Sequence, residues 1–442
     1  KERIFTAVNP SGSKEEKLRE VVETPTDRIV LVGTKPGTSL PEDEVKNLVL
    51  NRPELVIEEE TIDFKVQEQK NDQEGYKFTD IKRLPTTSVK SQDRAGTCWS
   101  WSTISFLESE IMRMGKDSLS LSPMYVVWNT YHAKGDKYVR MNGHVNFGQG
   151  GASADVTWAI RNYGIVPLSL YSGLNYGEEV HVHGELDAIL KGYLDAVVSN
   201  PNKKLSTAWL RGYDGILNAY LGEKPEKFTW QGKEYTPMTF ATDACGLNMD
   251  DYVSLTSFTH HPFYTQFALE VEDNWIGEMS YNLPLDELMD VLDKAIDKGY
   301  TFSWGSDVSE IGFTRDGLAV VPDVNIKEMS DAEIAKWVKM PKTQQQAELL
   351  KKPGKEKEIT QELRQQEFDN KLTTDDHGMH VIGKAVDQIG NKYFIVKNSW
   401  GDYGKYKGYL YASYPFVAYK TTSVMIHKDA LPKDLKKKLG IK

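Results

Sequence analysis

The chain has 442 residues, a net charge of −10 from 54 basic and 64 acidic side chains, and 39% hydrophobic residues. This length allows two or three domains, and no apolar run approaches the 18 residues that a membrane-spanning helix needs. The acidic balance argues against a general nucleic-acid surface, and the presence of only two cysteines argues against a disulfide framework.

Residues 1–71 differ from the rest because they contain no cysteine, tryptophan or histidine. Residues 28–36 and 56–66 have the pattern of strands, and residues 37–53 between them are predicted to be a spacer. The two strands resemble the closing and opening strands of the G-five module of bacterial surface proteins, in reverse order. This resemblance implies surface attachment or glycan contact, with an exposed linker as the alternative. Together with Lys1 in place of an initiator Met, it favours a secreted or cell-surface bacterial protein over a cytoplasmic one.

A cysteine in a short Gly/Thr turn begins a predicted helix. After Cys98, hydrophobic residues recur at steps of three and four: Ile104, Leu107, Ile111 and Met114. Gly115 is placed to end this helix. The first turn of a helix favours the thiolate, the form of cysteine that attacks carbonyl groups, because its backbone N–H groups are free. Gln92 lies six positions upstream and could turn its amide toward the sulfur, whereas the alternative is an inert buried cysteine.

The middle of the chain is predicted to be mainly helical. Ser122 and Pro123 have the pattern of a helix start. Further helices are expected at residues 184–198, 205–221 and 284–298, with a hairpin at 230–236. The charge-rich residues 326–372 are typical of a solvated pair of helices, or of a contact face in an oligomer.

The glycine loop, the second cysteine and the remaining histidines have the residue types of chemical sites but lack the required patterns. Gly148-Gln149-Gly150-Gly151 lacks the spacing of a dinucleotide-binding loop, and Cys245 is expected to be an inert buried thiol. We expect no metal and no cofactor, because the remaining histidines lack ligand spacing and are by default surface or hydrogen-bonded residues: His181, His183, His260, His261 and His380.

The far end of the chain supplies a histidine and an asparagine at the borders of two predicted strands. His377 enters an apolar, strand-like run, and a second strand at residues 391–397 ends at Asn398. Residues 377–428 alternate like an antiparallel sheet. Cys, His and Asn are the parts of an acyl-transfer site, in which the histidine takes the thiol proton and the asparagine orients the ring.

Four segments resemble the papain-type cysteine peptidases. Gln92 with Cys98-Trp99 resembles their oxyanion glutamine and nucleophile, and His377 with Gly383 resembles their histidine strand. The run from Asn398 to Gly401 resembles the segment of their third catalytic residue. Gly150-Gly151 resembles the glycine pair that lines their cleft and binds substrate backbone.

The closer resemblance is to the bleomycin hydrolase and aminopeptidase C branch, over about residues 75–442, on the segments 155–158, 163–167 and 303–308. It implies an α+β papain-like fold in a peptidase domain at 72–442. This fold has a helical lobe, an antiparallel β-barrel lobe and a large, mainly helical insertion at 171–300. The resemblance also implies a hexameric barrel and a C-terminal arm in the cleft that restricts the enzyme to amino-terminal trimming.

The resemblance assigns a role to eight residues: catalytic Cys98, His377, Asn398 and Gln92, and substrate-binding Gly150, Gly151, Trp400 and Asp376. It predicts peptide substrates and a thiolate–imidazolium pair. Residues 433–442 are shorter and more basic than the arm of the branch. An endopeptidase of broader specificity is therefore an alternative, and a surface-attached binding protein with a papain-like domain is another.

Overall fold

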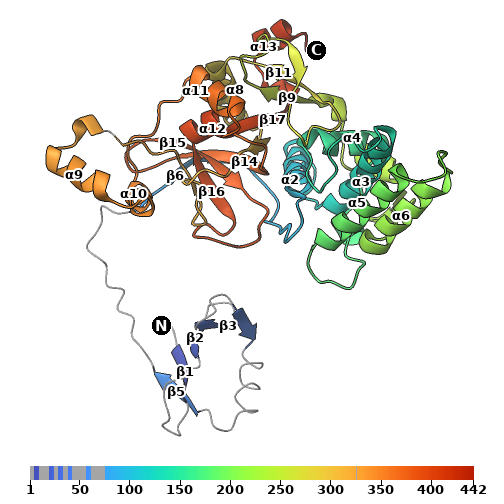
Figure 1. Cartoon of the computed structure of the whole chain (residues 1–442), viewed down its shortest axis with the longest axis horizontal. Coiled ribbons are helices and arrows are strands. Elements are labelled where there is room, and N and C mark those ends of the chain that lie inside the picture. Colours follow the sequence, from blue (N-terminus) through green and yellow to red (C-terminus); the bar gives the residue numbers. More distant parts are fainter. Residues whose placement is uncertain are drawn as a thin grey trace. The chain divides into compact units, whose positions relative to one another are not determined.

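The structure is a computed structural model (Figure 1). It describes residues 75–324 and 326–442, together with the backbone of five strands between residues 4 and 60. The chain divides into two compact units, Lys1–Glu74 and Gly75–Lys442. No helix of the described residues combines the length and the apolar character that crossing a bilayer requires.

The N-terminal unit contains one antiparallel sheet. Its strands are β1 (Ile4–Val8), β2 (Arg19–Glu23), β3 (Arg28–Val32), β4 (Thr38–Pro41) and β5 (Val56–Glu60), in the order β4-β3-β2-β1-β5. The predicted strands at 28–36 and 56–66 are confirmed over 28–32 in β3 and over 56–60 in β5; residues 33–36 and 61–66 lie outside the described residues. The predicted spacer at 37–53 is wrong at its start, because β4 pairs with β3 there. Pro41 lies at the end of this edge strand, where the missing backbone N–H of a proline is tolerated. The rest of that spacer lies outside the described residues.

The second unit is built on a sheet of ten strands. They are β6 (Thr79–Arg83), β9 (Tyr252–Thr256), β10 (Gln266–Ala268), β11 (Met279–Asn282), β12 (Phe302–Ser306), β13 (Leu318–Ala319), β14 (His377–Val386), β15 (Lys392–Lys397), β16 (Tyr409–Ser413) and β17 (Thr421–His427). Their order is β10-β11-β9-β17-β12-β14-β15-β16-β13, with β6 also paired to β14. The antiparallel pattern predicted for residues 377–428 is confirmed in β14 to β17.

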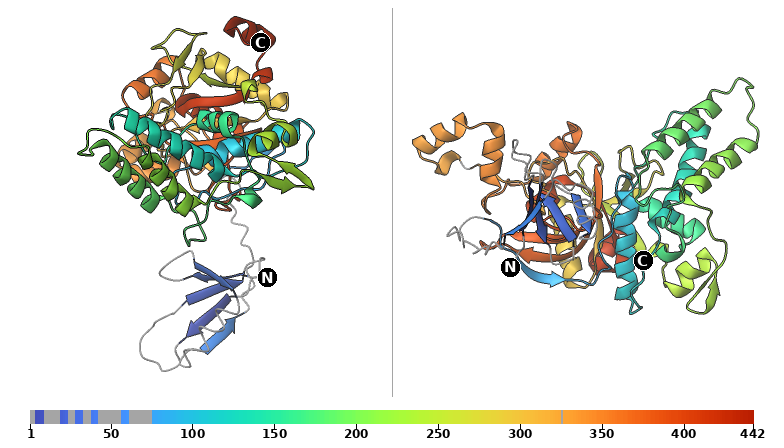
Figure 2. Two further views of the ribbon diagram at one scale, coloured as in Figure 1. Left: turned by 90° about the vertical axis from the view of Figure 1, so that its right-hand side faces the viewer. Right: turned by 90° about the horizontal axis from the view of Figure 1, so that it is seen from below.

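Helices make up the second lobe and cover parts of the sheet. They are α2 (Cys98–Arg113), α3 (Pro123–Arg140), α4 (Ser153–Tyr163), α5 (Gly184–Val198), α6 (Ala208–Leu221), α7 (Pro237–Thr239), α8 (Leu285–Asp297), α9 (Asp331–Lys339), α10 (Lys342–Leu349), α11 (Gln361–Asp369), α12 (Tyr414–Lys420) and α13 (Lys433–Leu439). Figure 2 shows α3 to α6 gathered on one side of the second unit and α9 with α10 projecting on the other. The α+β class with a helical lobe is confirmed.

The helix α2 lies between the two lobes. Every residue from Trp99 to Ile111 is buried, and Gly115 follows the helix at a positive φ of 83°, a conformation that suits glycine. The next helix, α3, begins where Ser122 Oγ accepts the Tyr125 N–H at 3.1 Å, as the sequence predicts. The start of α2 therefore has a fixed position at the junction of the lobes.

The insertion at 171–300 contains the expected helices. α5 buries Leu186, Leu190 and Leu194, and α6 buries Tyr213, Leu217 and Leu221, in each case at steps of four. The predicted hairpin is β7 (Phe228–Trp230) with β8 (Lys233–Tyr235). The second half of the insertion also supplies β9, β10 and β11, which extend the main sheet.

Candidate active site

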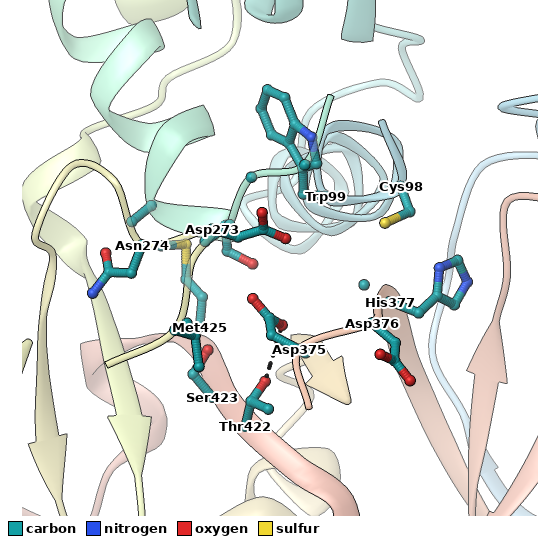
Figure 3. Close-up of a pocket in the computed structure, with 18 of the residues that line it drawn as sticks. Cys98, Trp99, Asp273, Asn274, Asp375, Asp376, His377, Thr422, Ser423 and Met425 are labelled. Carbon is teal, nitrogen blue, oxygen red and sulfur yellow. Dashed lines mark hydrogen bonds between the residues drawn. The ribbon is translucent and has the colours of Figure 1, made fainter. Parts of the chain in front are cut away.

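A cleft of about 320 Å³ lies between the two lobes and contains Cys98. Cys98 is the first residue of α2 and is partly buried. The backbone N–H of Gly378, which follows His377 on β14, acts to lower the pKa of the Cys98 thiol. Figure 3 shows the thiol at the end of α2 with the imidazole of His377 beside it on the neighbouring strand. Residues nearly three hundred positions apart are thus brought together.

His377 and Asn398 are placed by the hairpin of β14 and β15. His380 pairs with Lys397 in this hairpin, so the start of β14 lies next to the residue that follows β15. The Nε2–H of His377 donates to Asn398 Oδ1 at 2.8 Å. Asn398 Nδ2 donates in turn to the hydroxyl of Tyr403 at 2.9 Å, which fixes the orientation of the amide. This arrangement leaves the Nδ1 atom of His377 for the thiol.

Trp400 covers the imidazole of His377. The two ring centroids are 4.7 Å apart at 31°, and Trp400 is 37% exposed. The indole therefore separates the bond between His377 and Asn398 from solvent on one side.

Burial opposes charge on both members of the Cys98–His377 pair. It raises the pKa of the Cys98 thiol to about 12, and it lowers the pKa of His377 to about 4 even though the bond to Asn398 acts in the other direction. Thiol and neutral imidazole are therefore the forms that burial favours. The thiolate–imidazolium pair predicted from sequence requires the attraction between the two charges to offset both effects.

Gln92 lines the same cleft, with its side chain held from both ends. Its Nε2 donates to the Ala95 carbonyl at 2.9 Å, and its Oε1 accepts the Ser399 hydroxyl at 2.7 Å. An amide nitrogen carries two hydrogens, so the second N–H of Gln92 is available to an oxyanion beside Cys98.

The glycine loop forms another wall of the cleft. A Cβ added to Gly151 would lie 2.8 Å from atoms of the Trp99 ring, so no larger residue fits without a shift. Below the loop, the buried ammonium of Lys134 donates to the carbonyls of Gly148, at 2.9 Å, and of Gly150. Lys134 therefore fixes the loop, a role that the sequence did not suggest.

Asp376 lines the cleft, but its carboxylate is tied to neighbouring residues. It accepts the Thr374 hydroxyl at 2.7 Å and the Val308 N–H at 3.2 Å. Its neighbour Asp375 instead directs its carboxylate into the cleft (Figure 3). The sequence pattern indicated Asp376 and not Asp375, although the adjacent pair before His377 was a visible signal. Asp273, from the loop between β10 and β11, was also missed.

One group of side chains in the described residues has donor atoms close enough for a metal: His260, His261 and Glu270. Both imidazole Nε2 atoms lie by Glu270, at 2.9 and 2.6 Å. The Gln365 amide donates to Nδ1 of His260, which leaves the proton of the neutral ring on Nε2, the atom a metal would need. This network suits a hydrogen-bonded cluster better than a metal site.

His181 and His183 are not surface residues, because they are 6% and 0% exposed. The backbone of His181 bonds to Asp93 and Arg94, just before the nucleophile helix. A surface position is therefore wrong for both, whereas the hydrogen-bonded alternative is confirmed for His183, whose Nδ1 bonds to the Tyr131 hydroxyl at 3.1 Å.

The family comparisons agree with this geometry. The Peptidase C1-like family matches residues 148–352 and 356–441. The chain belongs to this family. It is a papain-type cysteine peptidase of the bleomycin hydrolase and aminopeptidase C branch. The matched residues include His377 and Asn398 and begin after Cys98.

Individual relatives resemble this peptidase over most of its length. Aminopeptidase C of Streptococcus thermophilus is 22% identical over 390 residues, which cover 79% of this chain and 82% of the relative. Aminopeptidase W of Lactobacillus delbrueckii subsp. lactis is 22% identical over 393 residues, covering 80% and 83%. The crystal structure of PepW from Lactobacillus rhamnosis HN001 superposes with a TM-score of 0.60 at 22% identity, covering 82% of this chain and 84% of that one. At this identity the structure shows the shared fold.

Proposed function

We propose that this peptidase is a cysteine aminopeptidase that uses Cys98, His377 and Asn398. The observation that carries the proposal is that Cys98 and His377 line one cleft, and that His377 Nε2 is bonded to Asn398 behind it at 2.8 Å. The relatives named aminopeptidase C and aminopeptidase W support the amino-terminal specificity. Peptides with a free amino terminus are the proposed substrates.

In the proposed mechanism, the sulfur of Cys98 attacks the carbonyl carbon of the first peptide bond while Nδ1 of His377 takes the thiol proton. The oxyanion is held by the backbone N–H of Cys98 and the free N–H of Gln92. His377 then gives its proton to the leaving amine as the C–N bond breaks, which leaves a thioester. Water attacks the thioester with His377 as base, and the acid product leaves as Cys98 recovers its proton.

Gly150 and Gly151 are proposed to bind the main chain of the substrate, because their backbone lines the cleft that contains Cys98. Asn398 keeps the proton on Nε2 of His377, so that Nδ1 faces the thiol. Trp400 excludes water from this bond.

An endopeptidase is the second candidate, and one observation favours it. Residues 433–439 form α13, which packs Leu435 and Leu439 against the core that contains Leu288. None of residues 433–442 lines the cleft, so this segment does not itself limit the enzyme to amino termini. The branch arm expected in the cleft is not formed by these residues.

A pair of peptides of the same sequence, one with a free and one with an acetylated amino terminus, separates the two candidates. An aminopeptidase cleaves the free peptide one residue from its start and leaves the acetylated one intact. Comparable cleavage of both would exclude amino-terminal specificity. Labelling by a thiol-directed epoxide at Cys98 tests the catalytic site itself, and failure to label would favour a surface-attached binding protein.

The assembly remains a proposal as well. Hexamer formation, implied by the branch, is tested by the mass of the native particle in light scattering. The proposed division into an N-terminal segment at 1–71 and a peptidase domain at 72–442 is tested by the activity of the chain without its first 71 residues.

A further inference from the structure

The cleft is acidic beside the nucleophile. Its lining includes Asp273, Glu278, Asp375 and Asp376 and no lysine or arginine among the described residues. An enclosed cleft with charges of one sign concentrates a ligand of the opposite sign. A peptide with a free amino terminus carries a positively charged α-ammonium group, whatever its sequence.

Asp375 is the carboxylate that faces this space most directly. Its side chain points into the cleft toward Asp273, and its carboxyl group is enclosed almost completely by protein atoms, although the residue keeps part of its surface open to the cleft (Figure 3). The Thr422 hydroxyl bonds to Oδ1 at a long 3.4 Å, and Oδ2 accepts no hydrogen bond from the described residues. Burial and then the charge of Asp273 raise the pKa of Asp375 to about 7. A buried carboxylate this poorly satisfied gains from a cation.

Asp273 faces Asp375 across the cleft, from the loop between β10 and β11. Its Oδ2 lies 2.7 Å from where a Cβ on Gly150 would be, so the carboxylate rests on the glycine loop. It accepts no hydrogen bond from the described residues. Burial raises its pKa, and the Lys134 ammonium, which opposes this, is already bonded to the carbonyls of Gly148 and Gly150.

We infer that Asp273 and Asp375 together bind a cationic ammonium group of the substrate, the α-amino group of the first residue. This inference rests on the proposed function and names the two residues that confer its specificity for amino termini. A substrate whose main chain lies along Gly150 and Gly151 brings its amino terminus to these carboxylates, and its scissile carbonyl to Cys98. The carboxylates thus select amino termini from within the cleft, without a contribution from residues 433–442. A lysine side chain near the scissile bond has the same ammonium chemistry and is the other possible source.

The test uses the full chain and three fluorogenic substrates: a leucyl amide with a free amino group, its acetylated form, and an acetyl-lysyl amide. The variants are Asp375→Asn, Asp273→Asn and the double variant. Glu272→Gln is the matched control, because Glu272 is exposed and does not line the cleft. This substitution also removes one negative charge, next to Asp273 in the sequence.

We expect each single variant to lower kcat/KM for the free leucyl substrate at least about tenfold, mainly through KM, since a hydrogen bond to a charged group is lost. The double variant should lose the preference for the free over the acetylated substrate, and hydrolysis of the acetylated substrate should not fall. Glu272→Gln should leave the preference unchanged. A preference in the double variant within twofold of the wild type would overturn the inference. A selective loss with the acetyl-lysyl substrate would also overturn it, and would assign the pair to a side chain.

The experiment distinguishes a failure of this inference from a failure of the proposed function. If the wild type shows no preference for a free amino group, the proposed aminopeptidase activity fails. If the wild type shows the preference and the double variant keeps it, only the role of Asp273 and Asp375 fails. Epoxide labelling of Cys98 in each variant shows that the nucleophile is still intact.

Discussion

Two histidines on β14 lie three residues apart in contrasting surroundings. His377 opens onto the cleft, beside Asp375 and Asp376. His380 lies in a sealed polar layer between the lobes, where Nδ1 bonds to the Ser105 hydroxyl at 2.8 Å and Nε2 to the Thr301 hydroxyl at 2.9 Å. Each histidine faces a different chemical setting although the strand is the same.

Buried charge is handled differently in these two regions. In the sealed layer, the ammonium of Lys397 donates to the hydroxyls of Thr86, Thr87 and Ser105. Glu108, close by, accepts from Thr87 at 2.7 Å. In the cleft, Asp375 has a single long bond. Buried polar groups whose hydrogen bonds are made within the protein stabilise the fold. Buried polar groups that lack such bonds beside a cavity indicate a ligand.

The largest effect should come from the reacting pair in the cleft. Cys98→Ala and His377→Ala should each lower kcat about 10⁴-fold or more, because the nucleophile or its base is lost. Steady-state hydrolysis of a free leucyl amide measures this. Cys245→Ala is the control, since Cys245 is fully buried in the helical lobe. An equal loss of activity in that control would contradict the assignment.

A smaller effect is expected at the oxyanion position. Gln92→Ala should lower kcat by about 10²–10³-fold with little change in KM, because its N–H is needed mainly in the transition state. Ser399→Ala removes the hydroxyl that bonds Gln92 Oε1 and should give a milder loss in kcat. A Gln92→Ala enzyme with unchanged kcat would exclude this role.

In the sealed layer the expected effect is on stability. Lys397→Met should lower the free energy of unfolding by about 3 kcal/mol, because it removes the cation that acts most strongly on the buried Glu108. Denaturant unfolding measures the change. The double variant Lys397→Met with Glu108→Gln should recover part of it, and a double variant less stable than the sum of the single losses would contradict the coupling.

The smallest effect concerns pH and His380. Burial, and then the charge of Lys397, lower the pKa of His380 well below its ordinary 6.5. Below pH 6.5 the unfolded chain binds a proton there that the folded chain does not, so stability is lost as the pH falls. This histidine alone should contribute a slope of about 1.4 kcal/mol per pH unit. Urea unfolding at pH 7, 6 and 5 should show a flatter profile for His380→Gln, and parallel profiles would exclude the contribution.

Local patterns were sufficient for the parts of the site that follow the ends of regular elements. The helix from Cys98 was predicted from its hydrophobic spacing, and the two predicted strands placed His377 at the start of one and Asn398 at the end of the other. These relations are set by helix period and hairpin pairing. They are therefore readable from consecutive residues.

Other features depended on contacts between distant segments. Asp273 comes from the loop between β10 and β11, strands that the sequence patterns did not indicate, and its position over Gly150 results from how that loop packs. Lys134 looked like an ordinary helix residue, but it is buried beneath the glycine loop. No periodicity in the sequence carries this information.

By itself, the sequence determined the residue types of a Cys-His-Asn site, their order and the elements that hold them, because helix and strand periods act over a few residues. The tertiary structure alone decided which carboxylates share the cleft with Cys98 and which charges the interior satisfies. Those outcomes depend on packing between segments up to three hundred residues apart, where the low dielectric of the interior makes each unpaired charge costly.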